Sequence, residues 1–395
     1  MRIIFVIPTL ACGGAEVLLG AIMQELHKEG HSILCVCLRS PHSSFINFPN
    51  KDFIEQVIQP VITTSKIEFS FFGGARIENS NFRQLLEDFK PDVIHSHLYE
   101  AELLSRSFIY PTARYVTHGH DNMPQFRRFT FNTLFNKTLL TNYKEYYWLC
   151  KAYKQVNNHF IAISKDVEQW FLNNVPSPLQ KNVHLLPNGF NFNYYNQGSR
   201  IRKPENKIRL ISIGNLVRKK NHQLLIQLAQ ILKNKNLDFA IDVYGYGPLM
   251  ESLKEEAIQL KVEKEIIFHG SVGDIHERLK KADIYIHPAT YEPFGLVLLE
   301  AMANGLPVIS LDGKGNRDLI KDGVNGYMIW KNEPELFADK IIELLGTETK
   351  MKSMSEAAIE FSKGYSIEGY VSKLLSIYRL SLNKTGYSAL GGSIA

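Results

Sequence analysis

The stretch HPATYEPFGLVLLEAMANG, residues 287–305, decides the fold of the second half of the chain. Its apolar run, PFGLVLL, has a glutamate on each flank, Glu292 and Glu300. A strand-like pattern, ADIYIHPA, leads into it, and another, PVISLD, follows it. Carboxylates are seldom fully buried unless something pairs with them. The two glutamates therefore raise the question of what they bind.

Short β-branched runs alternate with helical patterns through this half of the chain. The runs are RLISIG, FAIDVYG, EIIFHG, DIYIHPA, PVISLD and GYMIW. Such alternation predicts an α/β domain with a parallel, doubly wound sheet, whose ligands lie outside the carboxyl ends of the strands. Most of these strand ends carry glycine or polar residues, among them Asn215, Gly245 and His269. We expect this half to bind the ligand.

The first half begins in the same way, with the strand IIFVIPT, the loop ACGG, a helix and the strand ILCVCL. PDVIHSHL and ARYVTHGH are further strand patterns ending in polar loops. We predict a first domain, a polar linker, a second domain, a helix that packs back toward the first domain, and a tail, at 1–195, 196–207, 208–365, 366–383 and 384–395.

Composition limits the class of protein. The chain has 395 residues, of which 45% are hydrophobic and 22% charged, as in ordinary globular enzymes. A net charge of +5 is too weak a bias to indicate nucleic acid. No apolar run reaches transmembrane length, and the start favours a first strand over a signal peptide. The four cysteines lack paired zinc spacing, which suits reduced thiols in a cytoplasmic enzyme.

The opening stretch has the chemistry of a phosphate and sugar site. Pro293 suits the first turn of a helix, which we expect to begin at about Phe294–Gly295. The free amides of a helix N-terminus favour phosphate, and carboxylates accept paired sugar hydroxyls. Together these groups describe a nucleotide-sugar. The alternative is a helix start that merely favours an acid, with Glu300 paired to a lysine.

These motifs resemble those of retaining glycosyltransferases with the two-domain GT-B fold, glycosyltransferase family 4. The pattern E-P-F-G-L-x-L-L-E-A-M-A-x-G-x-P-V-I resembles the E-x7-E signature of that family. SIGNLVRKKNHQLLIQLA, YGYGP, IIFHG and DGVNGYMI match in the second half, and GGAEVLL, PDVIHSHL, THGH, IAISKDV and LLPNGF in the first. The resemblance covers nearly the whole chain and is weakest at about 40–85 and 120–155. It implies two doubly wound, Rossmann-like domains that face each other across a cleft.

The resemblance also implies roles for individual residues. Glu300 should hold the donor ribose, and Glu292 with the amides of Phe294 and Gly295 the transferred sugar. The amides of Leu296 and Val297 should meet the diphosphate, and Lys220 should supply it with a cation. The family commonly has an arginine where this chain has Asn215, and we expect Arg218 or Lys219 to substitute. Gly245 and His269 belong to the donor-binding strand ends, and the loop at His269–Val272 should influence base preference.

In the first half, Gly13 and Gly14 should lie near the donor diphosphate, although a tight strand-to-helix turn would explain them equally well. His118 resembles the active-site histidine beside the reacting sugar; its alternative is a structural role. His95 and His97, like His118 and His120, alternate on a strand and imitate a metal site. There is no Asp-x-Asp, and a helix N-terminus with Lys220 can replace a metal. We expect no metal and no cofactor beyond the nucleotide-sugar.

A basic and aromatic segment, FRRFTFNTLFNKTLLTNYKEYYWLCKAYK, lies between Arg114 and Phe160. Lys137, Lys144 and Lys151 recur every seven residues and would form one stripe on a helix. Such a helix suits a lipid headgroup layer, whereas the alternative is an ordinary domain helix with solvated lysines. The first interpretation favours a cytoplasmic enzyme at the inner face of the plasma membrane, peripherally bound to anionic lipid.

The sequence therefore predicts a retaining glycosyltransferase of the hexosyltransferase type. It would move a sugar from a nucleoside-diphosphate sugar, with UDP-sugar favoured, to a glycan or lipid-linked acceptor in bacterial surface polysaccharide, lipopolysaccharide or other glycolipid assembly. Two alternatives stay open. One is a non-catalytic nucleotide-sugar-binding regulator or scaffold of such an assembly, which the departure at Asn215 allows. The other is a nucleotide-sugar epimerase or phosphorylase on a related fold.

Overall fold

The computed structural model describes residues 1–10, 13–39, 53, 58–60, 68–69, 75–76, 79–123, 125–126, 129–196 and 207–382. Its contacts divide the chain into two compact units. Unit 1 comprises Met1–Pro187 and Tyr370–Ala395, and unit 2 comprises Asn188–Gly369. Residues 188–195, which we assigned to the first domain, make their contacts in unit 2. Most of the expected linker and all of the expected tail lie outside the described residues.

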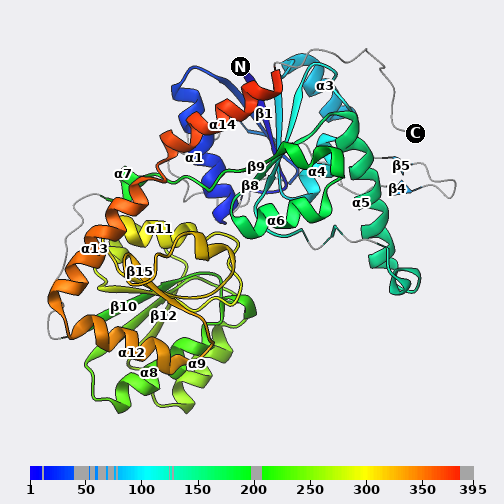
Figure 1. Ribbon diagram of the computed structural model, residues 1–395. Helices are drawn as coiled ribbons and strands as arrows, with labels where there is room; N and C mark the ends of the chain where they lie inside the picture. The colour runs from blue at the N-terminus through cyan, green and yellow to red at the C-terminus, as the bar shows by residue number, and fades with distance from the viewer. Residues whose placement is uncertain are drawn as a thin grey trace. The chain divides into compact units, whose positions relative to one another are not determined.

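Unit 1 is built on a seven-stranded parallel sheet in the order β3-β2-β1-β6-β7-β8-β9 (Figure 1). Its strands are β1 (Arg2–Ile7), β2 (Ser32–Cys37), β3 (Ile58–Pro60), β6 (Val93–His97), β7 (Arg114–Gly119), β8 (His159–Ala162) and β9 (Val183–Leu185). A separate antiparallel pair consists of β4 (Glu68–Phe69) and β5 (Ala75–Arg76). Because the strand order reverses beside β1, a switch point lies between the carboxyl ends of β1 and β6, where ligands of such sheets bind.

Helices cover both faces of this sheet. They are α1 (Gly14–Lys28), α3 (Ser80–Phe89), α4 (Tyr99–Ser105), α5 (Lys137–Gln155), α6 (Lys165–Asn174) and α14 (Ile367–Leu382), with the 3-10 turns η2 (Phe131–Leu134) and η3 (Ser177–Asn182). Side chains alternate along each strand. Ile4 and Ile94 therefore pack against Phe82 of α3 on one face. On the opposite face, His95 of β6 meets Tyr378 of α14.

Unit 2 repeats this plan with a six-stranded parallel sheet in the order β12-β11-β10-β13-β14-β15. Its strands are β10 (Ile208–Ile213), β11 (Phe239–Tyr244), β12 (Ile266–Gly270), β13 (Ile284–His287), β14 (Val308–Leu311) and β15 (Gly326–Ile329). The strand order reverses beside β10, so the switch point of this unit lies between β10 and β13.

The helices of unit 2 form two layers around the sheet (Figure 1). They are α7 (Phe192–Tyr195), α8 (Gln223–Asn234), α9 (Met250–Gln259), α10 (Ile275–Leu279), α11 (Leu296–Ala303), α12 (Pro334–Leu345) and α13 (Glu348–Lys363), with the 3-10 turns η4 (Arg218–Lys220) and η5 (Gly315–Asp318). α8 packs against α9 and α12, whereas α11 packs against α7 and α13. Apolar residues cover most of α11, as expected of a helix buried between a sheet and a second helix.

The predicted fold class is confirmed: both halves are doubly wound α/β domains. All six strand patterns that we singled out in the second half form strands of the unit 2 sheet. The patterns at the start of the chain, at PDVIHSHL and at ARYVTHGH form β1, β6 and β7 of unit 1. The expected final helix is α14, and from Tyr370 onward it belongs to unit 1.

Candidate active site

The polar groups of unit 2 gather at its switch point, where two loops are fastened together. The loop after β10 contains η4, and the loop after β13 leads to α11. The amide of Thr290 donates to the carbonyl of Lys219 at 2.9 Å, and the side-chain amide of Asn221 donates to the carbonyl of Pro288 at 3.0 Å. These bonds hold η4, the turn that contains Lys219 and Lys220, against the carboxyl end of β13.

A lysine and a glutamate from these two loops form an ion pair. Lys220 Nζ lies 2.5 Å from Glu292 Oε2, and His287 Nε2 lies 3.1 Å from the same oxygen. Glu292 is only 8% exposed. Burial alone would raise the pKa of Glu292, but the charge of Lys220 and the contact with His287 outweigh it and lower that pKa to about 2. Glu292 is therefore a carboxylate at neutral pH, and its main partner is the ammonium group of Lys220.

Two neutral histidines surround this pair. Burial, with smaller contributions from the nearby His287 and Lys220, lowers the pKa of His222, which precedes α8, to about 3. Burial also lowers the pKa of His287, although Glu292 opposes that shift. Lys220 is thus the group that balances the charge of Glu292. Sequence analysis did not assign His287, even though it is the first residue of the quoted stretch and ends a strand.

Glycines allow the backbones of neighbouring loops to meet at this edge of the sheet. A Cβ atom on Gly315 would lie 1.9 Å from the carbonyl oxygen of Pro293, and one on Gly245 would lie 2.0 Å from that of Gly214. The amide of Glu292 donates to the carbonyl of Gly313 at 2.8 Å. The loop after β14 therefore supports the segment that carries Glu292, and larger residues at these glycines would displace it.

The expected helix start needs a correction. α11 begins at Leu296, and Gly295 is its N-cap with φ of 99°, in the left-handed region. Pro293 therefore lies before the helix instead of in its first turn, because the chain must first reverse through Gly295. Phe294 is buried, whereas Leu296 and Val297 are partly exposed at the first turn. The helix N-terminus still follows the carboxyl end of β13.

Glu300 lies further along α11 and pairs with a tyrosine. The hydroxyl of Tyr195, in α7, hydrogen bonds to the carboxyl group of Glu300. Burial raises the pKa of Glu300 to about 7, and the bond from Tyr195 opposes that shift only in part. The partner that the structure gives Glu300 is thus a tyrosine, and not the lysine that we considered. Sequence analysis missed Tyr195, because it lies in a polar stretch that resembled a linker.

The other residues predicted for this site lie at neighbouring strand ends of unit 2. Asn215 and Arg218 are exposed in the loop after β10. Lys219 lies with its Nζ 5.6 Å from the ring centre of Tyr291, over its face. His269, at the end of β12, places its Nε2 2.6 Å from Asp242 Oδ1. These positions add two exposed cations to the loop that carries Lys220.

Unit 1 has a pocket of about 320 Å³ at its own switch point. Its lining comes from the segments that follow β1, β2, β6 and β7 and comprises Pro8, Thr9, Arg39, Leu98, Tyr99, Glu100, His120, Asp121, Asn122, Met123 and Gln125. Arg39 forms an ion pair with Glu100. Leu98 has φ of 70°, a rare conformation for a residue with a branched side chain, and one that concentrates at functional sites. The pocket offers both charges and amides to a polar ligand.

Gly13 and Gly14 begin α1 beside this sheet: Gly13 is its N-cap and Gly14 its first residue. A Cβ atom on Gly13 would meet the carboxylate of Glu16 at 2.3 Å. That carboxylate is the mobile end of a side chain, so the glycine is favoured without being indispensable. Ala11 and Cys12, which complete the loop, lie outside the described residues.

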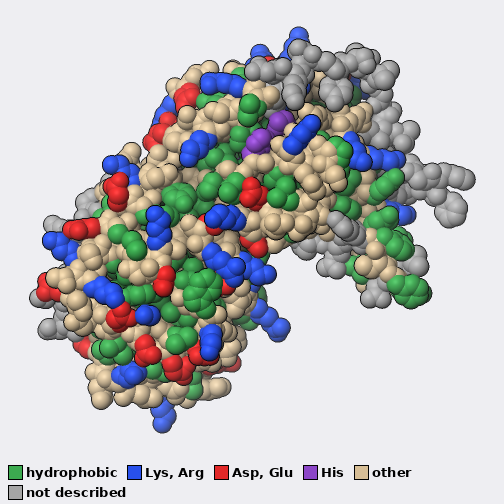
Figure 2. Space-filling model, viewed as in Figure 1, with side chains coloured by type: hydrophobic (Ala, Val, Ile, Leu, Met, Phe, Trp, Pro, Cys, Tyr) green, Lys and Arg blue, Asp and Glu red, His purple; other side chains and the backbone are tan. Residues whose placement is uncertain are grey.

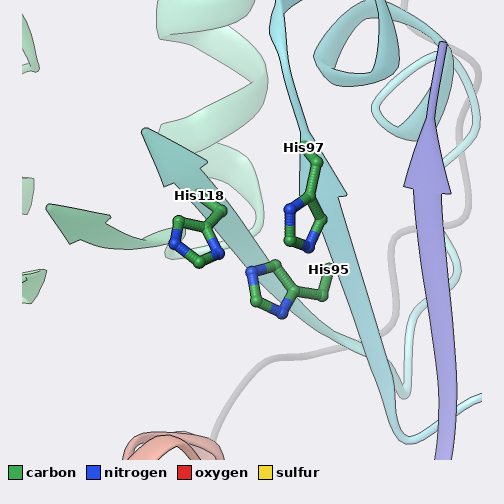
Figure 3. A group of neighbouring side chains, drawn as sticks. All are labelled: His95, His97 and His118. Atoms are coloured by element: carbon green, nitrogen blue, oxygen red, sulfur yellow. The ribbon is translucent and has the colours of Figure 1, made fainter. Parts of the chain in front are cut away.

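His118, on β7, belongs to a cluster of histidines with His95 and His97 of β6 and with His120, which directly follows β7. Its Cα is paired in register with that of His97, and its ring stacks on that of His120 with 4.2 Å between centres. Figure 3 shows His95, His97 and His118 converging on one space. Their ligand atoms lie within 4.8 Å of one another. His118 is 0% exposed. His120, in contrast, is half-buried and lines the pocket.

A further surface lies at the start of α5. Phe131 and Phe135 are 74% and 76% exposed, and their rings lie 5.2 Å apart. Three exposed lysines, Lys137, Lys144 and Lys151, follow along the helix. Figure 2 shows hydrophobic side chains over this end of α5. Among the described residues, no helix is both long enough and apolar enough to cross a bilayer.

Comparison with known families accounts for both units. The family described as Glycosyltransferase Family 4 matches residues 12–194, and the family described as Glycosyl transferases group 1 matches residues 196–361. The two matches are consecutive and together cover most of the chain.

Individual relatives agree. A putative glycosyltransferase of Bacillus subtilis, EpsF, is 29% identical over 214 residues, which are 52% of this chain and 55% of that protein. The chain thus spans about half the length of that relative. A galactosyltransferase of Escherichia coli, named UDP-Gal:alpha-D-GlcNAc-diphosphoundecaprenol alpha-1,3-galactosyltransferase, is 23% identical over 75% of this chain and 77% of its own. The crystal structure of Anabaena HepE with UDP and glucose superposes with a TM-score of 0.74 at 19% identity, covering 96% of this chain and 100% of the other. This last likeness concerns the fold.

Proposed function

Because the chain belongs to the family 4-like glycosyltransferases of the GT-B fold, we propose that it transfers a sugar from a UDP-sugar to an acceptor hydroxyl with retention of anomeric configuration. The reaction would take place in the assembly of a bacterial surface polysaccharide or glycolipid.

The observation that carries the proposal is the ion pair between Lys220 and Glu292, located at a switch point beside the start of α11. A cation and free helix amides suit a diphosphate, and an adjacent carboxylate suits sugar hydroxyls. Glu300, about one turn into the helix, suits the ribose. Packing alone does not require this set of groups at one strand end.

The names of relatives favour particular substrates. The Escherichia coli relative is named for UDP-Gal and for an acceptor linked to diphosphoundecaprenol, and HepE was crystallised with UDP, glucose and UDP-glucose. By analogy, we propose that the donor of this chain is a UDP-sugar and that its acceptor is a lipid-linked glycan. The pocket of unit 1, with Arg39, Asn122 and Gln125 in its lining, would take the polar part of that acceptor.

In the proposed reaction, the bond between the anomeric carbon and the β-phosphate oxygen breaks while the acceptor oxygen bonds to the same face of that carbon. The proton of the acceptor hydroxyl passes to the departing diphosphate. Lys220 and the amides of α11 stabilise the charge that builds on this group. His118, or the more accessible His120, would hydrogen bond to the sugar.

We further propose that this chemistry needs no divalent metal, because Lys220 and the helix N-terminus supply the positive charge. Treatment with a chelator should leave turnover unchanged. Dependence of turnover on added magnesium would contradict this part of the proposal.

We also propose that the protein works at the cytoplasmic face of the plasma membrane and binds anionic lipid through the start of α5. Exposed Phe131 and Phe135 would enter the headgroup layer, and the lysines of α5 would meet lipid phosphates. Replacing Lys144 and Lys151 by glutamate should weaken binding to phosphatidylglycerol vesicles at least about 10-fold. Replacing exposed Lys352 of α13 by glutamate is the matched control, and equal loss in both variants would contradict a role for α5.

The central test is release of UDP from a panel of UDP-sugars, first selected by thermal shift. We expect slow hydrolysis of one donor, faster release with a lipid-linked acceptor, and loss of both in Glu300→Gln. Donor-dependent melting shifts without turnover, even with acceptor, would instead indicate a nucleotide-sugar-binding regulator. Conversion of the donor to an isomer would indicate an epimerase.

A further inference from the structure

The histidine cluster of unit 1 has the composition and geometry of a metal site. His95, His97 and His118 come from the adjacent strands β6 and β7, and all three are buried. Their candidate ligand atoms lie within 4.8 Å of one another. A tetrahedral zinc ion with metal–nitrogen bonds of about 2.1 Å places its ligands about 3.4 Å apart, so small side-chain rotations suffice.

In two of these rings, those of His95 and His97, one nitrogen is hydrogen bonded and the other faces no hydrogen-bond partner among the described residues. His95 Nδ1 lies 2.6 Å from the hydroxyl of Tyr378, and His97 Nδ1 lies 2.8 Å from His120 Nε2. The Nε2 atoms of His95 and His97 are buried and have no hydrogen-bond partner among the described residues. Metal-binding histidines commonly use one ring nitrogen for the metal and the other for such an outer hydrogen bond. Tyr378 and His120 would play that outer role here.

The charges near the cluster are compatible with a bound cation. The nearby charge of Arg106 is balanced by Glu102, whose Oε2 lies 3.2 Å from Arg106 Nη1.

His120 lies between the pocket of unit 1 and the buried cluster, so an ion that entered from the pocket would have to pass it. His120 lines that pocket and is hydrogen bonded to His97 on its inner side. A rotation of His120 would open the path from the pocket to His97. With His120 back in its outer role, a water molecule would complete the coordination of the ion.

We propose that His95, His97 and His118 form a binding site for a divalent transition-metal ion such as Zn²⁺ or Co²⁺, and that its occupancy inhibits sugar transfer. The inhibitory half rests on the proposed function, in which His118 or His120 contacts the reacting sugar. Imidazole ligands favour zinc, copper and nickel, whereas magnesium prefers oxygen ligands. The site is thus compatible with a transfer reaction that needs no metal.

The binding test uses Co²⁺ and the full chain after dialysis against a chelator. We expect a visible ligand-field absorption that saturates at one ion per chain, that Zn²⁺ abolishes and that Mg²⁺ leaves unchanged. His97→Gln should weaken binding by at least about 100-fold, and Tyr378→Phe by about 10-fold, through loss of the outer hydrogen bond. His159→Gln, which alters a histidine pair elsewhere on the same sheet, should bind normally.

Several results would overturn the proposal. They are absence of the Co²⁺ band, a stoichiometry unaffected by His97→Gln, or equal weakening by His159→Gln. Tyr378→Phe provides the test if His97→Gln fails to fold, since it keeps all three proposed ligands. With an active donor, Zn²⁺ should inhibit UDP release at the concentration that displaces Co²⁺, and a chelator should restore it. Binding without inhibition refutes only the inhibitory half, and a protein without turnover still allows the Co²⁺ test.

Discussion

Replacing Lys220 by methionine should destabilise unit 2 in a pH-dependent way. The substitution keeps the apolar stem of the side chain and removes the charge that lies 2.5 Å from Glu292. Glu292 is buried and would keep only the contact with His287. A buried carboxylate that loses its main cation is left with an uncompensated desolvation cost.

The size of the effect follows from the pKa of Glu292. Its ordinary value is 4.5, and the folded protein lowers it to about 2. A difference of about 2.5 units corresponds to about 3 kcal/mol at neutral pH. Because the folded pKa is the lower one, this stability is complete above pH 4.5 and is lost as the pH falls toward 2. Wild type and Lys220→Met should therefore differ by about 2–3 kcal/mol at pH 7 and by roughly 1 kcal/mol near pH 3.

Differential scanning calorimetry of the full chain measures this difference. For a unit of this size, the expected loss corresponds to a fall in Tm of about 4–12 °C at pH 7. Hydrogen exchange of β10 and β13 in the same samples assigns the transition to unit 2. Arg218→Met removes an exposed cation from the same turn and should cost less than about 0.5 kcal/mol.

The double variant Lys220→Met/Glu292→Gln separates the charge effect from packing. It should be more stable than Lys220→Met alone at pH 7, because no unpaired charge remains. The reasoning would be refuted by a Tm of Lys220→Met equal to that of wild type, or by a loss of the same size at pH 7 and pH 3.

Three further predictions concern neighbouring groups. The pKa of Glu300 is raised to about 7, so ionisation should strengthen its bonds to a ribose: isothermal titration should show UDP affinity rising between about pH 6 and pH 8, and Glu300→Gln should abolish that rise. His118→Ala should reduce turnover far more than donor affinity, and comparison with His120→Gln identifies which ring contacts the sugar; equal losses of turnover and affinity would contradict such a role. Gly315→Ala would place Cβ 1.9 Å from a backbone carbonyl and should cost about 1–3 kcal/mol by calorimetry, whereas Gly346→Ala, with no neighbour nearer than 3.5 Å, should be tolerated.

The fold could be predicted from the sequence because its signals are local. Each strand of unit 2 is a short β-branched run between glycine or polar turns, and each connection is long enough for a helix. Gly30, which follows the C-cap Glu29 of α1, has φ of 81°, the left-handed conformation that makes glycine a local signal for a helix end. The start of α11 could not be placed to the residue, because the reversal at Gly295 depends on the support of the loop after β14.

The pairs in the site could not be predicted, because they depend on strand order. Lys220 and Glu292 are 72 residues apart and meet only because β10 and β13 are neighbours in the sheet. Tyr195 reaches Glu300 only because α7 packs on α11. In the sequence, the histidine cluster appears as two pairs at alternate positions, His95 with His97 and His118 with His120. Its convergence required the register that sets His97 opposite His118.

The ion pair at the switch point has a consequence for donor binding. Lys220 is expected to meet the diphosphate and Glu292 the sugar, yet in the structure each satisfies the other. A diphosphate must compete with Glu292 for Lys220, so binding exchanges one charge-assisted bond for another and gains less than a free lysine would give. In return, the pair keeps Glu292 ionised and holds both side chains at the strand ends before the donor arrives. His287, 3.1 Å from Glu292, remains to balance that carboxylate when Lys220 turns toward phosphate. Its pKa should then rise, because Lys220 no longer lies beside it. We therefore infer that donor binding is coupled to proton uptake at His287, and that proton uptake measured by calorimetry in buffers of different ionisation enthalpy would disappear in His287→Asn.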